Sequence, residues 1–319
     1  MVRWLVIGVG DITTKRVIPA ILEESRSQLY GIVTRDPAKA NPYGVKVFLS
    51  LGDALADGAF DAVYVASPVF LHAAQTIQSL LAGRHVLCEK PMAMNLTESQ
   101  AMLEAASRSG RQLGVAYYRR TYPKVNRAIE MLRQGVIGKP VCAYACCHNW
   151  FTASGGERAW LLDPTKAGGG PLYDIGCHRI DLLNYIFGEP LECRALLSNT
   201  IHQTAVEDCA TVLIKYPNQV HAIVDVRWHS RVTRDEFRIF GVEGEIDLTP
   251  LNDPQLVFSG GREELPTHSN LHYPCIKNFA DAITDGEPLL SSGASAWWTD
   301  WVIQHAVASA NNLGSEPKK

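Results

Sequence analysis

Short apolar runs alternate with segments of helical spacing over the first third of the chain. The runs are apolar at nearly every position, and the helical segments lie between them. This order is typical of a parallel sheet with helices on both faces. The predicted strands are Arg3–Ile7, Leu29–Val33, Val45–Phe48, Asp61–Ala66, His85–Cys88 and Leu113–Tyr117, and the predicted helices are Thr13–Glu24, Leu71–Ala82 and Thr97–Ser109. Residues 1–120 are therefore predicted to form an α/β domain.

The pattern changes in the second half, where the strands lengthen and turns such as Pro217-Asn218 replace helices. Along Val220–His229 every second residue is apolar and the residues between are mixed. Such alternation is typical of an antiparallel sheet with one covered face. The predicted strands are Pro140–Trp150, Leu191–Thr200, Asp208–Tyr216, Val220–His229 and Glu236–Leu248, and the predicted helices are Pro123–Arg133, Leu172–Phe187, Cys275–Thr284 and Ala294–Asn312. Residues 121–319 are predicted to form an α+β domain with an open, mostly antiparallel sheet.

Two features of assembly follow from this pattern. The mixed face of Val220–His229 can meet water or a second subunit, so a homodimer or homotetramer through the sheet is a hypothesis. The last helix, residues 294–312, is expected to pack back on the first domain.

Composition and charge narrow the class of protein. The chain has 319 residues, 46% of them hydrophobic, a net charge of −3 and no basic stripe. A nucleic-acid or anionic-membrane partner is therefore not expected. No stretch approaches the roughly 20 apolar residues of a membrane span. The first apolar run, Trp4–Val9, is shorter than that of a secretory signal, so a cytoplasmic protein with a small-molecule substrate is expected.

Eight scattered cysteines do not form the framework of a disulfide-rich protein. On a strand over residues 139–150, Cys142, Cys146 and His148 share one face, while Cys147 points the other way. Three ligands on one strand are a poor tetrahedral cage, and the chain has no CxxC pair. Reduced thiols and no metal site are predicted.

A glycine-rich turn, Gly8-Val9-Gly10-Asp11-Ile12-Thr13, follows the first predicted strand. In a Rossmann fold the first glycine allows a tight turn, the second lets the backbone approach a pyrophosphate, and the helix N-terminus faces the anion. Gly8, Gly10, Asp11 and Ile12 are therefore predicted to bind a dinucleotide. Thr13 replaces the third glycine, and glycine pairs also form ordinary turns. The prediction rests on the turn's place after an apolar strand in an α/β region.

The end of the second strand reads Val33-Thr34-Arg35-Asp36 and bears on the choice of cofactor. An acidic residue at this point binds the ribose 2′-hydroxyl of NAD. Thr34 offers a hydroxyl, and the Arg35 guanidinium can stack on adenine and pair with a 2′-phosphate. NADP is therefore predicted in preference to NAD. In the alternative, Arg35 is solvated and Asp36 holds the ribose of NAD.

Glu89-Lys90-Pro91 follows the strand His85–Cys88. Parallel sheets bind ligands at the carboxyl ends of their strands. An ammonium at this point can hold a substrate hydroxyl and stabilise charge as its proton leaves. The alternative is that Lys90 is an exposed loop residue paired with Glu89.

A second segment with candidate catalytic residues begins with Gly168-Gly169-Gly170. Three glycines in a row let the backbone approach a ligand closely. On a helix over Leu172–Phe187, Asp174 and His178 lie one turn apart on one face, and Asp181 follows. An imidazole is the natural proton carrier near neutral pH. The alternative is a surface histidine paired with Asp181, and a metal would lack a third convergent ligand.

Together these segments resemble the glucose–fructose oxidoreductase / inositol dehydrogenase / rhizopine-catabolism (Gfo/Idh/MocA) family. The resemblance runs from about residue 3 to about residue 312. Its specificity comes from Glu-Lys-Pro combined with the later Asp-x-x-x-His. The matching segments are Gly8-Val9-Gly10, Ser67-Pro68 with His72, His85–Pro91, Gly135-Val136-Ile137-Gly138, Gly168-Gly169-Gly170 with Asp174, Gly176, His178 and Asp181, and Gly241-Val242-Glu243-Gly244.

The resemblance implies a Rossmann domain and an open antiparallel α/β domain with the active site between them. It implies catalytic roles for Lys90, Asp174 and His178, with His178 exchanging the proton, and a cis bond before Pro91. The residues that it assigns to the cofactor are Ser67, Pro68, His72, Glu89 and Lys90. The Thr34-Arg35 pair resembles the Ser-Arg pair of NADP-preferring relatives. The implied activity is NAD(P)-dependent hydride transfer at a carbinol or carbonyl carbon of a small sugar or polyol.

A small polar substrate is expected from the residues that should border the cleft. They are Tyr118, Arg119, Arg120, Asn149, Trp150, Arg158 and Trp160, together with Asp174 and His178. Aromatic faces and hydrogen-bonding side chains suit a sugar, although each residue could equally belong to the core or to a hairpin. Two alternatives stay open: an NAD(P)-binding regulator that has lost the chemistry, and an enzyme for another substrate such as a dihydrodiol or a tetrapyrrole.

Overall fold

The computed structural model describes residues 1–152 and 158–313. The chain divides into two compact units. Unit 1 comprises Met1–Tyr118 and His268–Trp297, and unit 2 comprises Arg119–Thr267 and the residues from Trp298 on. A single boundary near residue 120 was predicted, so the inclusion of residues 268–297 in unit 1 differs from that expectation.

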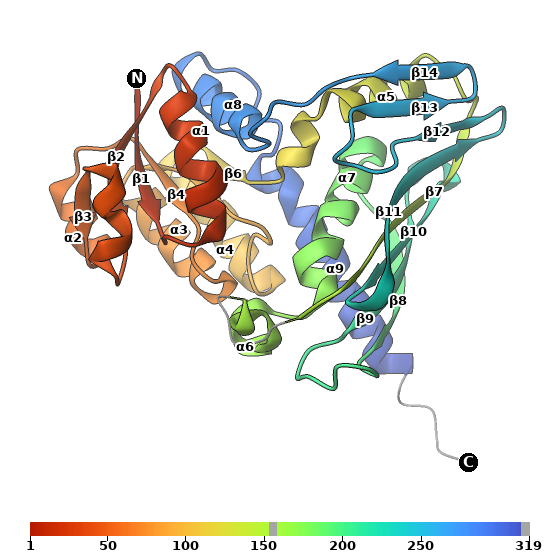
Figure 1. Cartoon of the computed structure of the whole chain (residues 1–319), viewed down its shortest axis with the longest axis horizontal. Coiled ribbons are helices and arrows are strands. Elements are labelled where there is room, and N and C mark those ends of the chain that lie inside the picture. The colour runs from red at the N-terminus through yellow and green to blue at the C-terminus, as the bar shows by residue number, and fades with distance from the viewer. Residues whose placement is uncertain (153–157, 314–319) are drawn as a thin grey trace. The chain divides into compact units, whose positions relative to one another are not determined.

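Unit 1 contains a six-stranded parallel sheet in the order β3-β2-β1-β4-β5-β6 (Figure 1). This is the strand order of a Rossmann fold, and it confirms the predicted α/β class. All four residues of β4 and five of the six in β1 are buried, as central parallel strands require. The strands are β1 (Val2–Ile7), β2 (Ser27–Val33), β3 (Lys46–Phe48), β4 (Ala62–Val65), β5 (His85–Cys88) and β6 (Leu113–Val115).

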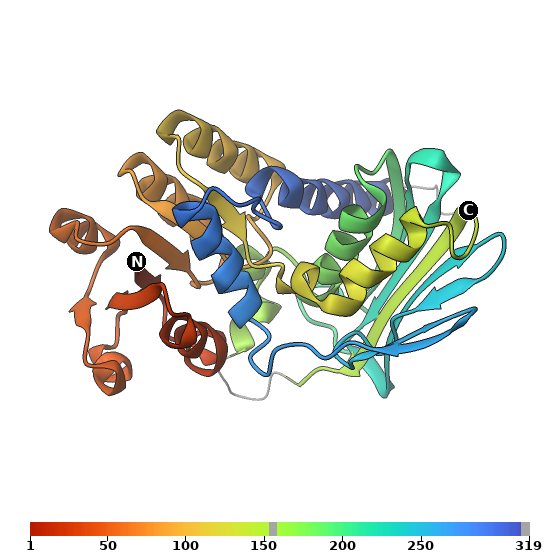
Figure 2. The ribbon, with the colours of Figure 1, turned by 90° about the horizontal axis from the view of Figure 1, so that it is seen from above.

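Helices cover both faces of this sheet, with α1 and α8 on one side and α3 and α4 on the other (Figure 2). They are α1 (Ile18–Glu23), α2 (Leu51–Asp57), α3 (His72–Leu81), α4 (Leu96–Ser109) and α8 (Tyr273–Thr284), with 3₁₀ turns at Pro37–Tyr43, Val69–Leu71 and, after β6, Tyr118–Thr121. The short helix α2 was not predicted. It begins at Ser50, whose side chain accepts a hydrogen bond from Asp53 N–H, and ends at Gly58.

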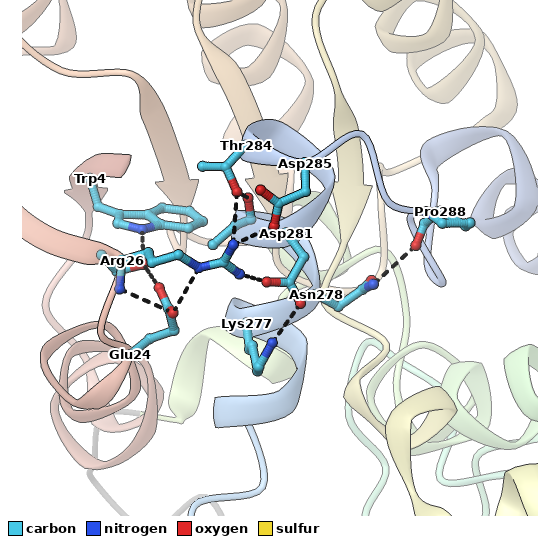
Figure 3. Close-up of polar contacts among 11 residues, drawn as sticks. Trp4, Glu24, Arg26, Lys277, Asn278, Asp281, Thr284, Asp285 and Pro288 are labelled. Atoms are coloured by element: carbon cyan, nitrogen blue, oxygen red, sulfur yellow. Dashed lines mark hydrogen bonds and ion pairs between the residues drawn. The ribbon is translucent and has the colours of Figure 1, made fainter. Parts of the chain in front are cut away.

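An ion-pair network ties α8 to the connection between α1 and β2 (Figure 3). The guanidinium of Arg26 contacts the carboxylates of Asp281 and Asp285. On the same side, Trp4 of β1 packs against Phe279 of α8 with ring centroids 5.5 Å apart. Because both residues belong to one buried apolar cluster, the segment that carries α8 completes the core of unit 1.

Unit 2 contains an eight-stranded sheet in the order β14-β13-β12-β11-β7-β10-β9-β8 (Figure 1). Neighbouring strands are antiparallel except β7 and β10, which pair in parallel. The predicted open, mostly antiparallel class is confirmed. The strands are β7 (Pro140–Trp150), β8 (Glu192–Ser198), β9 (Cys209–Lys215), β10 (His221–Arg227), β11 (His229–Gly241), β12 (Glu245–Asp247), β13 (Gln255–Phe258) and β14 (Gly261–Glu264).

The helices of unit 2 lie on one face of its sheet (Figure 2). They are α5 (Pro123–Arg133), α6 (Pro164–Ala167), α7 (Cys177–Phe187) and α9 (Gly293–Leu313), of which the residues from Trp298 on belong to this unit, with 3₁₀ turns at Ala159–Leu162 and Pro217–Gln219. Ala222, Val224 and Val226 of β10 are buried, whereas His221 is exposed. The alternation predicted for this strand is therefore present, and we call the face opposite the helices the open face.

One strand predicted from the sequence forms two separate strands in the structure. The sequence predicted a single strand over Glu236–Leu248, but β11 ends at Gly241 and β12 begins at Glu245. Gly241 N–H donates to Gly244 O at 2.8 Å, which closes a turn between them. A Cβ at Gly241 would lie 2.0 Å from Ile137 O. Only glycine allows the backbone this approach, so the prediction of a continuous strand was wrong.

Two predicted α-helices begin with a π-helical turn instead. The π turns are Thr13–Val17, before α1, and Leu172–Gly176, before α7. A π turn is rare, and it occurs frequently at functional sites. Both turns follow the glycine-rich segments that the sequence singled out for chemistry.

None of the eight cysteines forms a disulfide within the described part of the chain. His148 lies 3.0 Å from a carboxylate oxygen of Asp225 on the neighbouring strand.

Among residues 1–152 and 158–313, every helix is too short or too polar to cross a membrane.

Candidate functional site

The glycine-rich turn after β1 allows a close approach of backbone. Gly8 has a φ of +92°, and a Cβ there would lie 2.7 Å from Ala66 O. Glycine tolerates both conditions. At Gly10 an added Cβ would meet nothing within 4 Å. The turn therefore packs β1 against the end of β4 and leaves open space beside the second glycine, as a pyrophosphate cradle requires.

Thr13 stands at the position of the third glycine, and its buried side chain closes the turn by binding the backbone of Gly10. Its side chain is fully buried, and its Oγ1 accepts from Gly10 N–H and donates to Gly10 O, both at 2.8 Å. Asp11 and Ile12 remain exposed, and Asp11 forms a surface ion pair with Lys15 at 2.9 Å. The residues predicted to meet a pyrophosphate thus lie at the N-terminal end of the first helix.

The turn after β2 presents one exposed cation. Thr34 is buried, and its hydroxyl accepts from Asp36 N–H at 3.1 Å and donates to Asp36 O at 3.2 Å. The Asp36 carboxylate accepts from Ala38 N–H at 3.1 Å and caps the 3₁₀ turn that follows. Arg35 is exposed. Thr34 therefore shapes the turn, and Arg35 presents an exposed guanidinium on it.

His72 links the loops that follow β4 and β5. It is 1% exposed, with Nε2 2.9 Å from Ser67 O and Nδ1 3.0 Å from Pro91 O. Burial lowers the pKa of His72, and a neutral ring donates to only one of the two carbonyls. The structure thus places this predicted cofactor residue beneath the two loops, next to Ser67 and Pro68.

Glu89 is a buried carboxylate under the turn that carries Lys90. Its Oε1 accepts from Tyr64 OH at 2.6 Å and lies 3.8 Å from Nε2 of His272, and its Oε2 accepts from Lys90 N–H at 3.2 Å. Burial raises the pKa of Glu89, but His272 and Tyr64 outweigh burial and hold the pKa below its usual value. An ionised Glu89 therefore fixes the turn at the carboxyl end of β5.

Lys90 itself is half-buried, and the peptide bond between Lys90 and Pro91 is cis, as the resemblance implied. The half-buried position differs from the exposed loop lysine of the alternative interpretation.

In unit 2, the carboxylate of Glu207 holds the triple-glycine segment. Its oxygens accept from Gly170 N–H at 2.8 Å and from Leu172 N–H at 3.1 Å. A Cβ at Gly170 would lie 2.0 Å from Glu207 O, so only glycine fits. Burial raises the pKa of Glu207. This residue fixes the entry to the π turn and was missed, because no pattern around it in the sequence marks a contact with the glycines.

Asp174 and His178 lie on the helix that follows. Asp174 is in the π turn, and its Oδ2 accepts from the exposed guanidinium of Arg158 at 2.9 Å. His178 is the second residue of α7 and is 6% exposed. The helix therefore carries a partly exposed carboxylate and a nearly buried imidazole about one turn apart.

Asp181, the third candidate residue of this segment, does not lie at the surface with Asp174. It is 1% exposed and forms a two-pronged ion pair with Arg120, at 2.6 and 2.9 Å. Asp181 is therefore a core residue of unit 2 and is not the surface partner of His178 that the alternative required. Arg120, expected beside the substrate, is buried with it.

The other residues expected near the substrate lie on several elements, and each is described within its own unit. Tyr118, in unit 1, packs against His272 with ring centroids 4.4 Å apart and the rings tilted. In unit 2, Arg119 is 8% exposed. Trp150 lies 5.0 Å from the ring of His202 and under the guanidinium of Arg231. Trp160 packs on an apolar cluster around Phe151 and Trp228, and Asn149 is half-buried on β7.

His272 is a second residue that the sequence did not single out. It is 3% exposed, precedes α8 and lies between Glu89 and Tyr118. No periodicity could place it there, because residues 268–297 reach unit 1 only through tertiary packing.

Family models match both halves of the chain. Residues 2–117 match the oxidoreductase family with an NAD-binding Rossmann fold, and residues 125–247 match the GFO/IDH/MocA C-terminal domain.

Relatives and solved structures agree with these matches. The 1,5-anhydro-D-fructose reductase of Ensifer adhaerens is 28% identical over 99% of this chain and 98% of its own. The trans-1,2-dihydrobenzene-1,2-diol dehydrogenase of Mus musculus is 30% identical over 83% and 80%. The aldose-aldose oxidoreductase from Caulobacter crescentus, solved with glycerol, superposes with a TM-score of 0.88 at 25% identity and 98% coverage of both chains.

Proposed function

Because the chain belongs to the GFO/IDH/MocA oxidoreductase family and has an NAD(P)-binding Rossmann domain, we propose that it transfers hydride to or from a carbinol or carbonyl carbon of a small sugar or polyol. One observation carries the proposal: the turn that carries Lys90 at the carboxyl end of β5 and the turn that carries Asp174 before α7 each have backbone N–H groups bound by a carboxylate, the buried Glu89 in the first and the half-buried Glu207 in the second. The names of the relatives, a reductase of an anhydro sugar and an aldose oxidoreductase, support this substrate class.

The residues of this chain supply binding and proton transfer. NAD(P), when bound, supplies the hydride chemistry. In oxidation, His178 accepts the proton of the substrate hydroxyl, Lys90 stabilises the charge that develops on the oxygen, and Asp174 orients the hydroxyl. In reduction, His178 returns the proton. A positioned acid or base of this kind contributes about 10²–10⁴-fold to the rate.

Titration with NADPH and NADH, followed by turnover assays on a panel of polyols, aldoses and ketoses, tests the function. We expect cofactor binding, and turnover of at least one sugar or polyol. Binding without turnover of any substrate would instead indicate a regulator that has kept the fold. Turnover restricted to a dihydrodiol would retain the reaction class and reject the sugar.

NADP is the cofactor that the turn after β2 favours. Arg35 is exposed beside the buried hydroxyl of Thr34, and the carboxylate of Asp36 is engaged by Ala38 N–H. A guanidinium pairs well with a 2′-phosphate, whereas a ribose hydroxyl calls for a carboxylate.

Arg35→Ala is expected to weaken NADPH binding by about tenfold or more, the loss of one charge-assisted contact. NADH binding should change little. Fluorescence titration of both cofactors measures the two constants. Arg108→Ala, at an exposed position in the last turn of α4, is the matched control and should change neither. An equal loss for both cofactors, or a strong preference of the unaltered protein for NADH, would reject NADP.

We also propose that the protein is a homodimer or homotetramer joined through the open face. Tyr144, Ile223 and Leu213 lie side by side there on β7, β10 and β9. Leu213 is 54% exposed, and Leu196 of β8 is 65% exposed. An apolar row on an uncovered sheet face is typical of a subunit contact.

Light scattering is expected to give at least twice the chain mass of 35.1 kDa, and Leu213→Arg is expected to lower it to one chain. Leu22→Arg replaces a leucine that is 63% exposed on α1, outside this face, and should leave the mass unchanged. A single-chain mass for the unaltered protein would end the proposal.

A cytoplasmic location is proposed on the strength of the thiols. Eight cysteines with no disulfide among them in the described residues, five of them buried, suit a reducing compartment. Recovery of the protein in a secreted or periplasmic fraction would contradict this.

A further inference from the structure

Unit 2 brings together three potential metal ligands that lie outside the residues proposed for hydride transfer. Asp208 immediately precedes β9, Cys209 is the first residue of β9, and His229 is the first residue of β11. One ligand atom from each lies within 4.8 Å of the others. Trp228 N–H donates to Asp208 O at 2.8 Å. This backbone bond holds the start of β11 beside Asp208, so the strands themselves fix the three residues next to one another.

One oxygen of the Asp208 carboxylate is committed to the backbone. Oδ2 accepts from the N–H groups of Thr200, Ile201 and His202, at 3.1, 2.7 and 3.0 Å. Three N–H donors on one oxygen suit a carboxylate, and they hold the buried Asp208 in a fixed orientation.

The other oxygen faces the cluster. Oδ1 is fully buried, has no hydrogen-bond partner in the described part of the chain, and lies 3.9 Å from Nε2 of His229. A buried carboxylate oxygen without a hydrogen-bond donor is costly, and native proteins rarely retain one. This orphaned acceptor is a second observation, independent of the spacing of the cluster, that points to a bound cation.

We propose that Asp208, Cys209 and His229 bind a divalent transition metal of the zinc class through Oδ1, Sγ and Nε2. A carboxylate oxygen, a sulfur and an imidazole nitrogen form a donor set that zinc accepts in tetrahedral sites, with water in the fourth position. Oδ2, held by three N–H groups, would serve as the support that orients the ligand.

The distance between Asp208 and His229 suits such an ion after a small adjustment. Bond lengths of about 2.0–2.2 Å to nitrogen and oxygen place two tetrahedral ligands about 3.4 Å apart. The 3.9 Å between His229 and Asp208 therefore has to shorten by about half an ångström.

Binding of the metal requires the thiol of Cys209 to lose its proton. Cys209 is half-buried, and its Sγ lies 3.9 Å from Ser198 O. The metal replaces this proton, which passes to solvent, and the sulfur–metal bond forms as the sulfur–hydrogen bond breaks.

The position gives such an ion a structural role. Asp208 adjoins Glu207, whose carboxylate holds Gly170 and Leu172 at the entry to the π turn. An ion that joins Asp208 to β11 would therefore stiffen the support of that turn. This inference does not depend on the proposed reaction, because its test measures metal binding.

The test adds Co²⁺, and separately Zn²⁺, to the full chain after treatment with a chelator. A thiolate-to-cobalt charge-transfer band at a stoichiometry of one ion per chain is expected, with loss of the band when Zn²⁺ is added. Zn²⁺ should also raise Tm. Cys209→Ser should abolish the band, and His229→Asn should weaken Zn²⁺ binding at least about tenfold.

Cys142→Ser is the matched control, because Cys142 is also half-buried on the sheet of unit 2 but lies outside the cluster. It should bind cobalt like the unaltered protein. The proposal is overturned if the unaltered chain gives no charge-transfer band, if the band survives Cys209→Ser, or if Cys142→Ser removes it. If the unaltered chain gives no band, His229 and Asp208 form an ion pair and bind no metal.

Discussion

Lys90→Ala and His178→Ala are each expected to lower kcat more than about a hundredfold, because each removes a group that the proposed reaction assigns to the reacting hydroxyl. His178 is 6% exposed at the start of α7, so solvent has little access to replace its proton transfer. Lys90 is presented by a turn that the buried Glu89 fixes. Both variants should still bind NADP(H), since the glycine turn and Arg35 are unchanged. Steady-state kinetics and cofactor titration measure the two effects separately.

Matched controls come from the same chain. His221→Ala removes an exposed imidazole of β10, and Lys139→Ala removes an exposed ammonium before β7. Neither should change kcat. His178→Gln keeps a polar side chain but cannot carry the proton, so it should be as slow as His178→Ala. Near-normal rates in Lys90→Ala and His178→Ala would reject the proposed roles.

Asp181→Ala is expected to cost about 3–5 kcal/mol of the free energy of unfolding, the usual effect of removing one partner of a buried ion pair. Arg120 and Asp181 are 2% and 1% exposed in their side chains and join through two bonds, at 2.6 and 2.9 Å. The guanidinium of Arg120 also lies over the ring of Tyr185, 5.2 Å from its centroid. Without Asp181, this buried cation would lose the carboxylate that it binds at two points. Urea unfolding followed by fluorescence measures the change.

Glu192→Ala is the control for this loss. Its partner Arg194 lies 3.0 Å away, but the side chains are 51% and 65% exposed. Exposed pairs contribute about 0–1 kcal/mol, so this variant should unfold near the midpoint of the unaltered protein. If Asp181→Ala also unfolded there, the pair would have no stabilising role, and its burial would need another explanation.

Local patterns in the sequence predicted the secondary structure well. Apolar runs located the six strands of the Rossmann sheet, and alternation along Val220–His229 located the covered face of β10, because burial of a strand leaves a period of two in the residues. The two predicted helices that begin with π turns show the limit of such patterns. A π turn adds one residue to a turn, and the hydrophobic period around Thr13 and Gly176 does not record it.

The chain by itself determined the class of fold, the glycine turn at Gly8 and the residue types needed for proton transfer, since each depends on neighbours within a few positions. Only the tertiary structure decided the partners: that Asp181 is buried against Arg120, that Glu207 holds Gly170, and that residues 268–297 complete unit 1. Those contacts join residues far apart in the chain. A hydrophobic period records how deeply a residue is buried but carries no information about what it touches.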